Sequence, residues 1–431
     1  MNIGIVGGGM MGLALAYRLS QQGHKVTVFE SNQQLGGLTT YHDYGSFIWD
    51  RFYHVILPSD THLIKFIKDI GLADKLRWHR TLTGCYIDQK LYSISNTLEF
   101  LRFPPLTIIG KLRLAITLLY GSRINNWRRL EKIPVEDWLL KLSGRNTYEK
   151  LWKPLLLAKL GDNYQRVSAV FIWSYIKRLF SARDSSLHKE QLGYVAGGYK
   201  TVFDRLEELI RLAGGDIHTE AKVEYIAPHQ HGGIWVEYNG KKERFDKVIF
   251  TGPVNVLQSV VARDMVKISQ TSGTVEYLGV ICMALITRKA LVPYYIVNLA
   301  DQHLPFTGVL GMSNLVSLQE TAGMHITYFP KYVHSDDPIL KQPDDELQKL
   351  FFQGLRLMFP KLTADDIVAA HINRATKMQP LQVLNYSNLV PKVVTENNDF
   401  FVLNTSQFVN DTLNNNTVVK HVDEFVKNIR E

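Results

Sequence analysis

The chain has 431 residues, of which 45% are hydrophobic and 21% are charged, and its net charge at pH 7 is +8. This length exceeds the size at which a single core keeps growing, so we expect two domains, and the composition is that of an ordinary globular protein. A run of about 18 uncharged apolar residues is absent from the sequence, which argues against a membrane span.

The first predicted strand starts almost at residue 1, so we expect no signal peptide. The two cysteines, Cys85 and Cys282, are far apart and form no metal-ligand or redox motif. They indicate buried thiols in a reducing compartment, which predicts a cytoplasmic location. The sequence predicts no metal site.

The first thirty residues predict a strand, a glycine turn, a helix and a second strand. An apolar run at 2–6 leads into the glycine-rich run at 7–12, which opens an apolar helical pattern, and residues 25–29 form the next strand. Gly7 permits a tight turn, Gly9 lets the main chain approach a pyrophosphate, and Gly12 lets helix and strand pack closely.

The start of this helix and the end of the second strand complete a dinucleotide motif. The helix begins near Met10 and Met11, where unpaired amides can face phosphates. Glu30 ends the second strand, where a carboxylate can accept both hydroxyls of an adenosine ribose. The segment therefore predicts dinucleotide binding.

Residues 30–40 resemble the extended fingerprint of the flavin-containing amine oxidase superfamily, which includes protoporphyrinogen oxidase, phytoene desaturase and UDP-galactopyranose mutase. The resemblance implies FAD as the cofactor and an α/β fold. It implies a Rossmann-like FAD-binding domain of the GR2 type with a second domain of mixed sheet and helices.

The same resemblance implies cofactor contacts beyond Glu30. Gly36 and Gly37 are expected to pass the pyrophosphate and to lead the chain toward the flavin ring. Leu38 replaces the family's usual basic residue. We also count Ser31 and Thr39 among the expected cofactor contacts.

An aromatic stretch at 44–56 follows, and the resemblance implies that it passes beside the isoalloxazine ring. His54 is therefore a candidate catalytic residue in contact with the ring. The alternative is a histidine whose side chain is satisfied in the core.

The segment 98–132 carries seven basic and two acidic residues and so supplies +5 of the net charge. Its apolar residues Ile108, Leu112, Ala115, Ile116 and Leu119 recur at helical spacing. Three interpretations compete: a core helix with a solvated face, a helix on an anionic membrane surface, or a nucleic-acid patch. We expect no nucleic-acid partner and keep peripheral membrane contact as a possibility.

The run 151–161 resembles a Trp-x-Pro-Leu-Leu-x-x-Lys-Phe-Gly segment of a bacterial branch of the superfamily, with Leu160 in place of phenylalanine. A lysine held against a flavin can have a lowered pKa and can orient a water, so Lys159 is the second candidate catalytic residue. The alternative is a surface or salt-bridged lysine.

Residues 191–199 resemble the family's glycine-rich return to the cofactor domain. Alternating residues at 217–219, 222–226 and 233–238 predict a three-stranded meander, and 247–250 predict a core strand. The resemblance implies that Val223, in the meander, binds adenine through its main chain.

The C-terminal segment departs most from the family. A strand at 400–403 is followed by Asn404, where the family has a Gly-Asp or Ala-Asn step beside the cofactor. Thr417 is expected to cap the last helix, so that the first amides of that helix, at Thr417 and Val418, face the flavin.

We therefore predict an FAD-binding domain formed by residues 1–75, 191–265 and 385–431, and a substrate domain formed by 76–190 and 266–384. The predicted function is FAD-dependent oxidation, by hydride abstraction, of a small or lipid-linked substrate such as an amine, an alcohol or a C–C bond. The alternatives are a non-redox sugar mutase resembling UDP-galactopyranose mutase, a cofactor-poor binding protein, and a nicotinamide dehydrogenase. The oligomeric state is left open.

Overall fold

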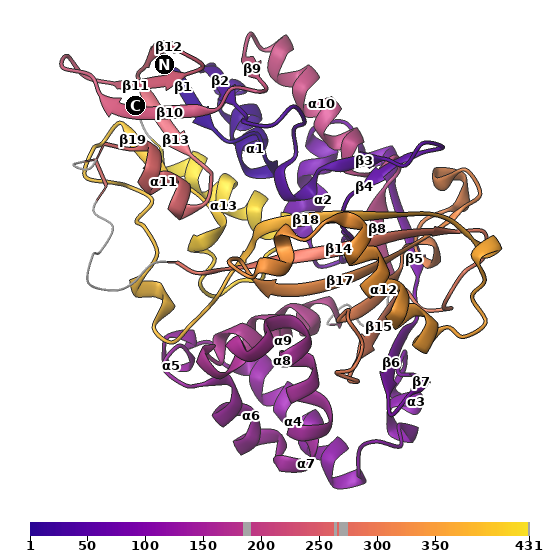
Figure 1. Cartoon of the computed structure of the whole chain (residues 1–431). Helices are drawn as coiled ribbons and strands as arrows, with labels where there is room; N and C mark the ends of the chain where they lie inside the picture. The colour runs from indigo at the N-terminus through magenta and orange to yellow at the C-terminus, as the bar shows by residue number, and fades with distance from the viewer. Residues whose placement is uncertain (184–190, 263–264, 267–274, 430–431) are drawn as a thin grey trace.

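A five-stranded parallel sheet carries the N-terminal glycine turn. The computed structural model describes residues 1–183, 191–262, 265–266 and 275–429. The strand order is β19, β13, β1, β2, β9, so strands from three distant parts of the sequence lie side by side (Figure 1). The strands are β1 (Asn2–Val6), β2 (Lys25–Phe29), β9 (Asp216–His218), β13 (Lys247–Phe250) and β19 (Phe400–Val402).

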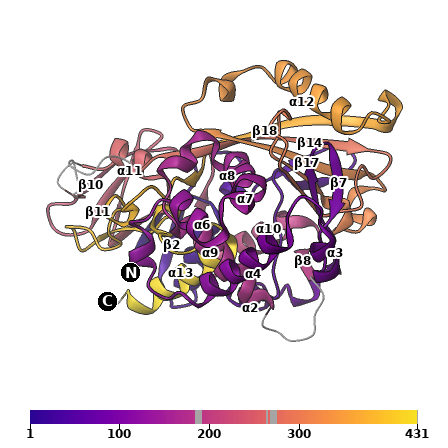
Figure 2. The ribbon, with the colours of Figure 1, turned by 90° about the horizontal axis from the view of Figure 1, so that it is seen from below.

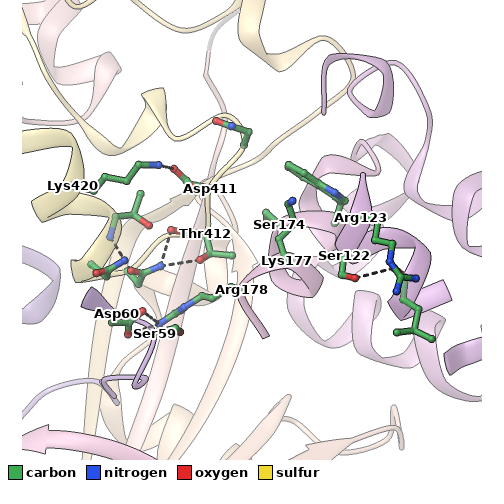
Figure 3. A pocket seen from close by; sticks show the side chains of 16 residues that line it. Ser59, Asp60, Ser122, Arg123, Ser174, Lys177, Arg178, Asp411, Thr412 and Lys420 are labelled. Carbon is green, nitrogen blue, oxygen red and sulfur yellow. Dashed lines mark hydrogen bonds and ion pairs between the residues drawn. The ribbon is translucent and has the colours of Figure 1, made fainter. Parts of the chain in front are cut away.

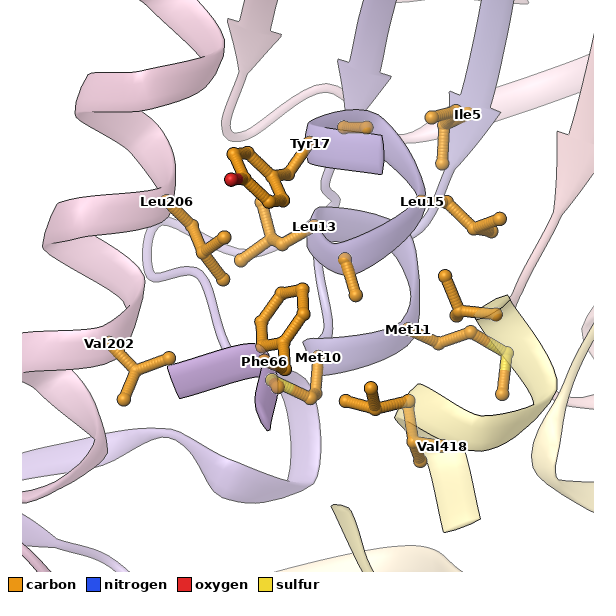
Figure 4. Close-up of a cluster of buried hydrophobic side chains, with 14 of the residues drawn as sticks. Ile5, Met10, Met11, Leu13, Leu15, Tyr17, Phe66, Val202, Leu206 and Val418 are labelled. Atoms are coloured by element: carbon orange, nitrogen blue, oxygen red, sulfur yellow. The ribbon is translucent and has the colours of Figure 1, made fainter. Parts of the chain in front are cut away.

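Both faces of this sheet are covered, which is why its strands read as nearly continuous apolar runs. One face, with Ile3, Ile5 and Val28, packs in a core with helix α1 (Met10–Ser20) and three helices around it (Figure 4). The three helices are α2 (Thr61–Asp69), α10 (Gly198–Leu212) and α13 (Asn415–Asn428).

The opposite face, with Val248 and Phe250, packs on an antiparallel meander. The meander consists of β10 (Val223–Pro228), β11 (Ile234–Tyr238) and β12 (Lys241–Phe245). The prediction that 217–219 would open the meander was wrong. β9 pairs in parallel with β2 and extends the main sheet, a long-range pairing that a three-residue alternation does not reveal.

A seven-stranded mixed sheet forms the second large unit, in the order β18, β14, β17, β16, β15, β6, β7. All eleven residues of β14, which lies between β18 and β17, are buried. Cys85 and Cys282 lie in this sheet and are buried free thiols. The strands are β6 (Thr83–Ile87), β7 (Lys90–Ser93), β14 (Tyr277–Thr287), β15 (Ile296–Leu299), β16 (Gly308–Gly311), β17 (His325–His334) and β18 (Ile367–Pro380).

A helical segment between β7 and β8 lies below this sheet in Figure 1. Its helices are α3 (Thr97–Arg102), α4 (Ile108–Arg123), α5 (Trp127–Leu130), α6 (Val135–Ser143), α7 (Arg145–Thr147), α8 (Lys153–Leu160) and α9 (Val170–Arg183). The remaining elements are β3 (Tyr41–Asp43), β4 (Ile48–Asp50), β5 (Leu76–Arg80), β8 (Gln191–Val195), α11 (Val254–Val260) and α12 (Asp344–Met358).

The interpretation of residues 98–132 as a core helix was wrong in its choice of buried face. The face of α4 that packs inward contains Gly110, Lys111, Leu114, Thr117 and Gly121. The apolar residues that suggested a core helix are exposed instead. Small residues are buried because they allow close helix contacts: a Cβ added to Gly110 would lie 2.8 Å from the Thr147 hydroxyl.

The fold class follows the prediction: an α/β protein with a Rossmann-like parallel sheet and a second unit of mixed sheet and helices. Within the described ranges, no helix combines the length and the apolar character that crossing a bilayer requires.

Candidate functional site

The two glycine turns of the N-terminal segment are in direct contact. Gly7 has a φ of 115°, a value that favours glycine. The Gly36 amide donates to the Gly8 carbonyl at 2.9 Å, and Gly9 forms a parallel bridge with Gly36. A Cβ added to Gly12 would lie 1.9 Å from the Gly7 carbonyl oxygen, so this glycine permits the close approach of α1 to β1.

Helix α1 begins at this turn with no side-chain cap on its first amides. The side chains of Met10 and Met11 are buried in the core that also contains Val418 of α13 (Figure 4). These two methionines can therefore contribute to a ligand site only through their main-chain amides.

Glu30 follows β2 and its side chain is buried. One carboxylate oxygen, Oε2, accepts the Gly8 amide at 2.8 Å. The other, Oε1, accepts the Asn32 amide at 2.9 Å and the Asn32 side chain at 2.7 Å, with Ser31 Oγ at 3.3 Å. Because each carboxylate oxygen has about two acceptor positions, Oε2 is the oxygen that can take a further donor.

Val223 is buried at the start of β10, where its backbone pairs with Tyr238. On the other side of the turn, Leu38 and Thr39 form a short 3-10 helix with Gly37. The Thr39 hydroxyl donates to Asn415 Oδ1 at 3.3 Å, which ties this segment to the start of α13. The N-terminal and C-terminal segments expected at the cofactor thus meet in space.

The expectation that Thr417 caps the last helix was wrong. α13 begins at Asn415, and its N-cap is Asn414, whose Oδ1 accepts the Thr417 amide at 2.9 Å. The Val418 amide donates to the Asn414 carbonyl at 3.1 Å. Both amides that were expected to face a flavin are therefore bonded within the helix.

Asn404 has a structural task at the end of β19. Its buried side chain accepts the Ser406 amide through Oδ1 at 3.0 Å and donates through Nδ2 to the Gly252 carbonyl at 2.9 Å. Its own amide donates to Gln407 Oε1 at 2.9 Å. These bonds join the ends of β19 and β13 and engage both polar atoms of the side chain.

His54 and Lys159, the two candidate catalytic residues, lie in different surroundings. His54 Nδ1 is buried, is 3.8 Å from Asp50 Oδ2, and has no hydrogen-bond partner among the described residues. Its ring lies 5.4 Å from the ring of Tyr199, between centroids.

Lys159 of α8 projects onto the aromatic surface of the mixed sheet. Its Nζ lies 3.8 Å from the ring centroid of Tyr332 on β17, and the Tyr332 hydroxyl is hydrogen-bonded to that of Tyr53. Desolvation lowers the pKa of Lys159 to about 7. Burial raises the pKa of both tyrosines, which keeps them neutral.

Asp50 is a residue of this region that the sequence interpretation missed. Its side chain is buried, and Oδ1 accepts the Tyr199 amide at 2.9 Å near the start of α10. Its carbonyl accepts the Tyr44 hydroxyl at 3.2 Å. The signal was present, because an acid within an aromatic stretch is expected to be buried and bonded. Tyr332 carries no comparable local signal, since its partner Tyr53 is far away in the sequence.

A cavity of about 810 Å³ lies between the start of α13 and the helices α4 and α9 (Figure 3). Its charged lining residues are Arg123, Lys177, Arg178, Lys420, Asp60 and Asp411. Arg178 pairs with Asp60 and Lys420 pairs with Asp411, each at 3.0 Å. Cations therefore outnumber carboxylates in the lining.

Comparison with known protein families gives a match to the family described as flavin containing amine oxidoreductase, over residues 10–374.

Individual relatives match shorter or more divergent regions. A 4,4'-diapophytoene desaturase of Staphylococcus haemolyticus is 38% identical over 66 residues, which is 15% of this chain and 13% of the relative. Protoporphyrinogen oxidase 2 of Arabidopsis thaliana is 33% identical over 73 residues, 17% of this chain and 14% of the relative. A 15-cis-phytoene desaturase of Glycine max is 20% identical over 286 residues, 60% and 48% respectively. The matches thus span less than half the length of these relatives.

Similarity to solved structures extends over the whole fold. An oxidoreductase of Methanosarcina mazei superposes with a TM-score of 0.76 at 18% identity, covering 99% of this chain and 100% of the other. Reduced UDP-galactopyranose mutase gives 0.74 at 14% identity, with 100% and 96% coverage. Putrescine oxidase bound to putrescine gives 0.73 at 14% identity, with 99% and 98% coverage. At these identities the superpositions establish the fold alone.

Proposed function

Because the chain belongs to the flavin-containing amine oxidoreductase family, we propose that it is an FAD-dependent oxidoreductase that removes a hydride equivalent from a small or lipid-linked organic substrate. The observation that carries this proposal is the contact between the two glycine turns, through the Gly36 amide and the Gly8 carbonyl, beside the carboxylate of Glu30. In this proposal, residues 1–75, 191–265 and 385–431 bind the cofactor, and 76–190 and 266–384 bind the substrate.

The residues at the adenosine end fit a dinucleotide. A Cβ added to Gly9 would have only two backbone atoms nearby, the Gly37 Cα at 3.8 Å and the Gly36 carbonyl oxygen at 4.0 Å, so the surface next to Gly9 is made of main chain. The amides that open α1 have no side-chain cap, and Oε2 of Glu30 retains an acceptor position.

We assign the cofactor contacts accordingly. The pyrophosphate is proposed to lie against Gly7, Gly9 and the amides of Met10, Met11 and Gly12, with Gly36, Gly37, Leu38 and Thr39 opposite. Glu30 and Ser31 are proposed to hold the ribose, and Val223 the adenine. For Asn404, Thr417 and Val418 we propose a supporting role, because their polar groups are engaged within the chain.

The bound flavin supplies the redox chemistry by accepting the hydride equivalent, and the protein binds and orients it. We propose that Lys159 handles the proton of this reaction at Nζ, since a lysine with a pKa of about 7 can hold or release a proton near neutral pH. Tyr332 and Tyr53 fix the position of this amine. His54 is proposed as a second residue that contacts the flavin ring.

The cavity beside α13 is proposed to admit the substrate. Its excess of cationic residues disfavours a protonated amine and favours a neutral or anionic substrate. Desaturases and protoporphyrinogen oxidases among the relatives agree with oxidation at carbon rather than with amine oxidation.

A cofactor-poor binding protein is the second candidate, and one observation favours it. The groups that were expected to contact the flavin half of FAD are bonded within the chain: the Asn404 side chain accepts the Ser406 amide, and the Thr417 amide donates to Asn414. The two candidates differ in whether the purified protein binds FAD at all.

Titration of the cofactor-free protein with FAD, followed by flavin fluorescence, tests the proposal. We expect binding by the wild type and at least about tenfold weaker binding by Gly9→Ala, because the methyl group would separate the pyrophosphate from the main chain. Gly308→Ala is the matched control, since an added Cβ there also has its nearest neighbour at 3.8 Å but lies in β16. Both variants should melt at the wild-type temperature without FAD. A wild-type protein that binds no FAD would leave the binding-protein candidate standing.

A further inference from the structure

The helix α4 has its apolar face turned outward. Five aliphatic side chains on this face, Ile108, Ile109, Leu112, Ile116 and Leu119, are between 44% and 85% exposed. The buried face of the same helix is made largely of glycine, threonine and a lysine. A surface helix of a globular protein normally has the reverse arrangement, so this outward face is built for contact with something apolar.

The neighbouring helix α3 extends this surface. Leu98 and Leu101 are 56% and 58% exposed. The Lys111 ammonium donates to the Leu101 carbonyl at 2.7 Å, which fixes the end of α3 beside the first turns of α4. We call the exposed side chains of Leu98, Leu101, Ile108, Ile109, Leu112, Ile116, Leu119 and Tyr120 the α3–α4 face. Figure 2 views the molecule from the side on which these helices lie.

The segment that bears the α3–α4 face carries a net positive charge. Both acids of the segment 98–132 are engaged within the protein: Glu99 accepts from Ser93 and Ser95, and Glu131 is buried and accepts from Ser387. The exposed cations of the same segment are Arg102, Arg113, Arg123, Arg128, Arg129 and Lys132. Arg128 also stacks on Trp127, with its guanidinium carbon 4.9 Å from the ring centroid.

From this pairing of an exposed aliphatic face with a cationic rim, we infer that the α3–α4 face docks on the surface of an anionic lipid bilayer. The aliphatic side chains enter the interface and the arginines contact lipid phosphates. The cavity described above begins at the end of the same helix, because Leu119 and Arg123 belong to its lining. A bilayer bound at this face therefore lies next to this part of the cavity lining.

Flotation with vesicles tests this inference without any assumption about the cofactor or the reaction. The full-length protein should float with vesicles of phosphatidylcholine and phosphatidylglycerol, and much less with phosphatidylcholine alone. Raising the salt from about 0.1 M to about 1 M should weaken binding, because the Debye length falls from about 10 to about 3 Å. Ile109→Gln and Leu112→Gln should each lower the partition coefficient about tenfold or more, since each removes a buried aliphatic side chain from the interface.

Leu212→Gln and Leu357→Gln are matched controls, because these leucines are 75% and 60% exposed on α10 and α12. They should bind vesicles like the wild type, and all four variants should keep the wild-type melting temperature. Equal loss of binding in the controls would overturn the inference, as would failure of the wild type to float. A dimer in sedimentation velocity that Ile109→Gln dissociates would assign the face to a second copy of the chain instead.

Discussion

The ammonium of Lys159 lies over the ring of Tyr332, 3.8 Å from its centroid. A ring quadrupole attracts a cation, but it does not replace the water that burial removes. Desolvation is therefore the dominant cause of the lowered pKa of Lys159, about 7. Lys159 is partly buried and forms no ion pair with the described residues, so it matches neither the surface lysine nor the salt-bridged lysine that the sequence left open.

Replacing this lysine should stabilise the protein in a pH-dependent way. Below pH 7, Lys159 is protonated in both the folded and the unfolded state, and burial of the charge opposes folding. As the pH rises from about 7 toward about 10.4, the folded protein holds fewer protons than the unfolded chain, and the penalty disappears. Lys159→Met should thus raise the free energy of unfolding at pH 6 by about 1 kcal/mol or more, and hardly at all at pH 10.

Urea unfolding of the cofactor-free protein at several pH values measures this difference. Lys153→Met is the matched control on the same helix, because Lys153 forms an exposed ion pair with Glu149 at 3.3 Å. The control should show no gain in stability at pH 6. An equal gain at pH 6 and pH 10 for Lys159→Met would contradict the desolvation argument.

A second prediction concerns the buried amide of Asn404. Asn404→Ala leaves the Ser406 amide and the Gly252 carbonyl without their partner and should cost about 2 to 4 kcal/mol of unfolding free energy. Asn404→Asp keeps the acceptor for Ser406 but can donate to the Gly252 carbonyl only while its carboxyl is protonated, so its cost should be smaller than that of Asn404→Ala at acid pH and should rise when the carboxyl ionises. Chemical denaturation without FAD is the measurement. A negligible effect of Asn404→Ala would mean that the residue is kept for cofactor contact rather than for structure.

Local sequence pattern predicted much of this molecule because its main signals are local. The strand, turn and helix at 2–20 are set by apolar periodicity and glycine spacing, and the core strand at 247–250 by its apolar run. The exposed face of α4 could not be assigned in this way. Periodicity reveals which residues share a face, but whether that face is buried depends on the small residues that bring α4 against its neighbours.

The candidate site was predictable in its glycine turns and not in its long-range contacts. Glu30 and Gly36 carry a recognisable spacing, whereas the bond between Tyr53 and Tyr332 joins segments with no shared signal. The cap of α13 was missed because 414–417 contains four consecutive residues that can cap a helix. Only the backbone geometry distinguishes Asn414, with extended φ and ψ of −164° and 167°, from the residues that follow.

A third prediction therefore tests this cap. Asn414→Ala removes the acceptor of the Thr417 amide and should cost about 1 kcal/mol of unfolding free energy. Asn414→Asp should restore the stability, because aspartate caps helices as well as asparagine and its charge favours the helix N-terminus. Thermal or urea unfolding of the wild type and both variants measures these differences in stability. If Asn414→Ala proved neutral, the cap would lie elsewhere in 414–417.

The last prediction separates a catalytic His54 from a histidine that merely fills space. Its Nδ1 is buried without a hydrogen-bond partner among the described residues, and leaving such an atom unsatisfied costs about 1 to 3 kcal/mol. His54→Phe keeps a planar ring against Tyr199 and removes this cost, so the cofactor-free protein should be unchanged or stabilised by about 1 kcal/mol. If His54 contacts the flavin, the same variant should shift the absorption maximum of the bound cofactor, while a change at Lys153 should not. A stable variant with an unaltered flavin spectrum would show that His54 is a packing residue and would leave Lys159 as the candidate for proton handling.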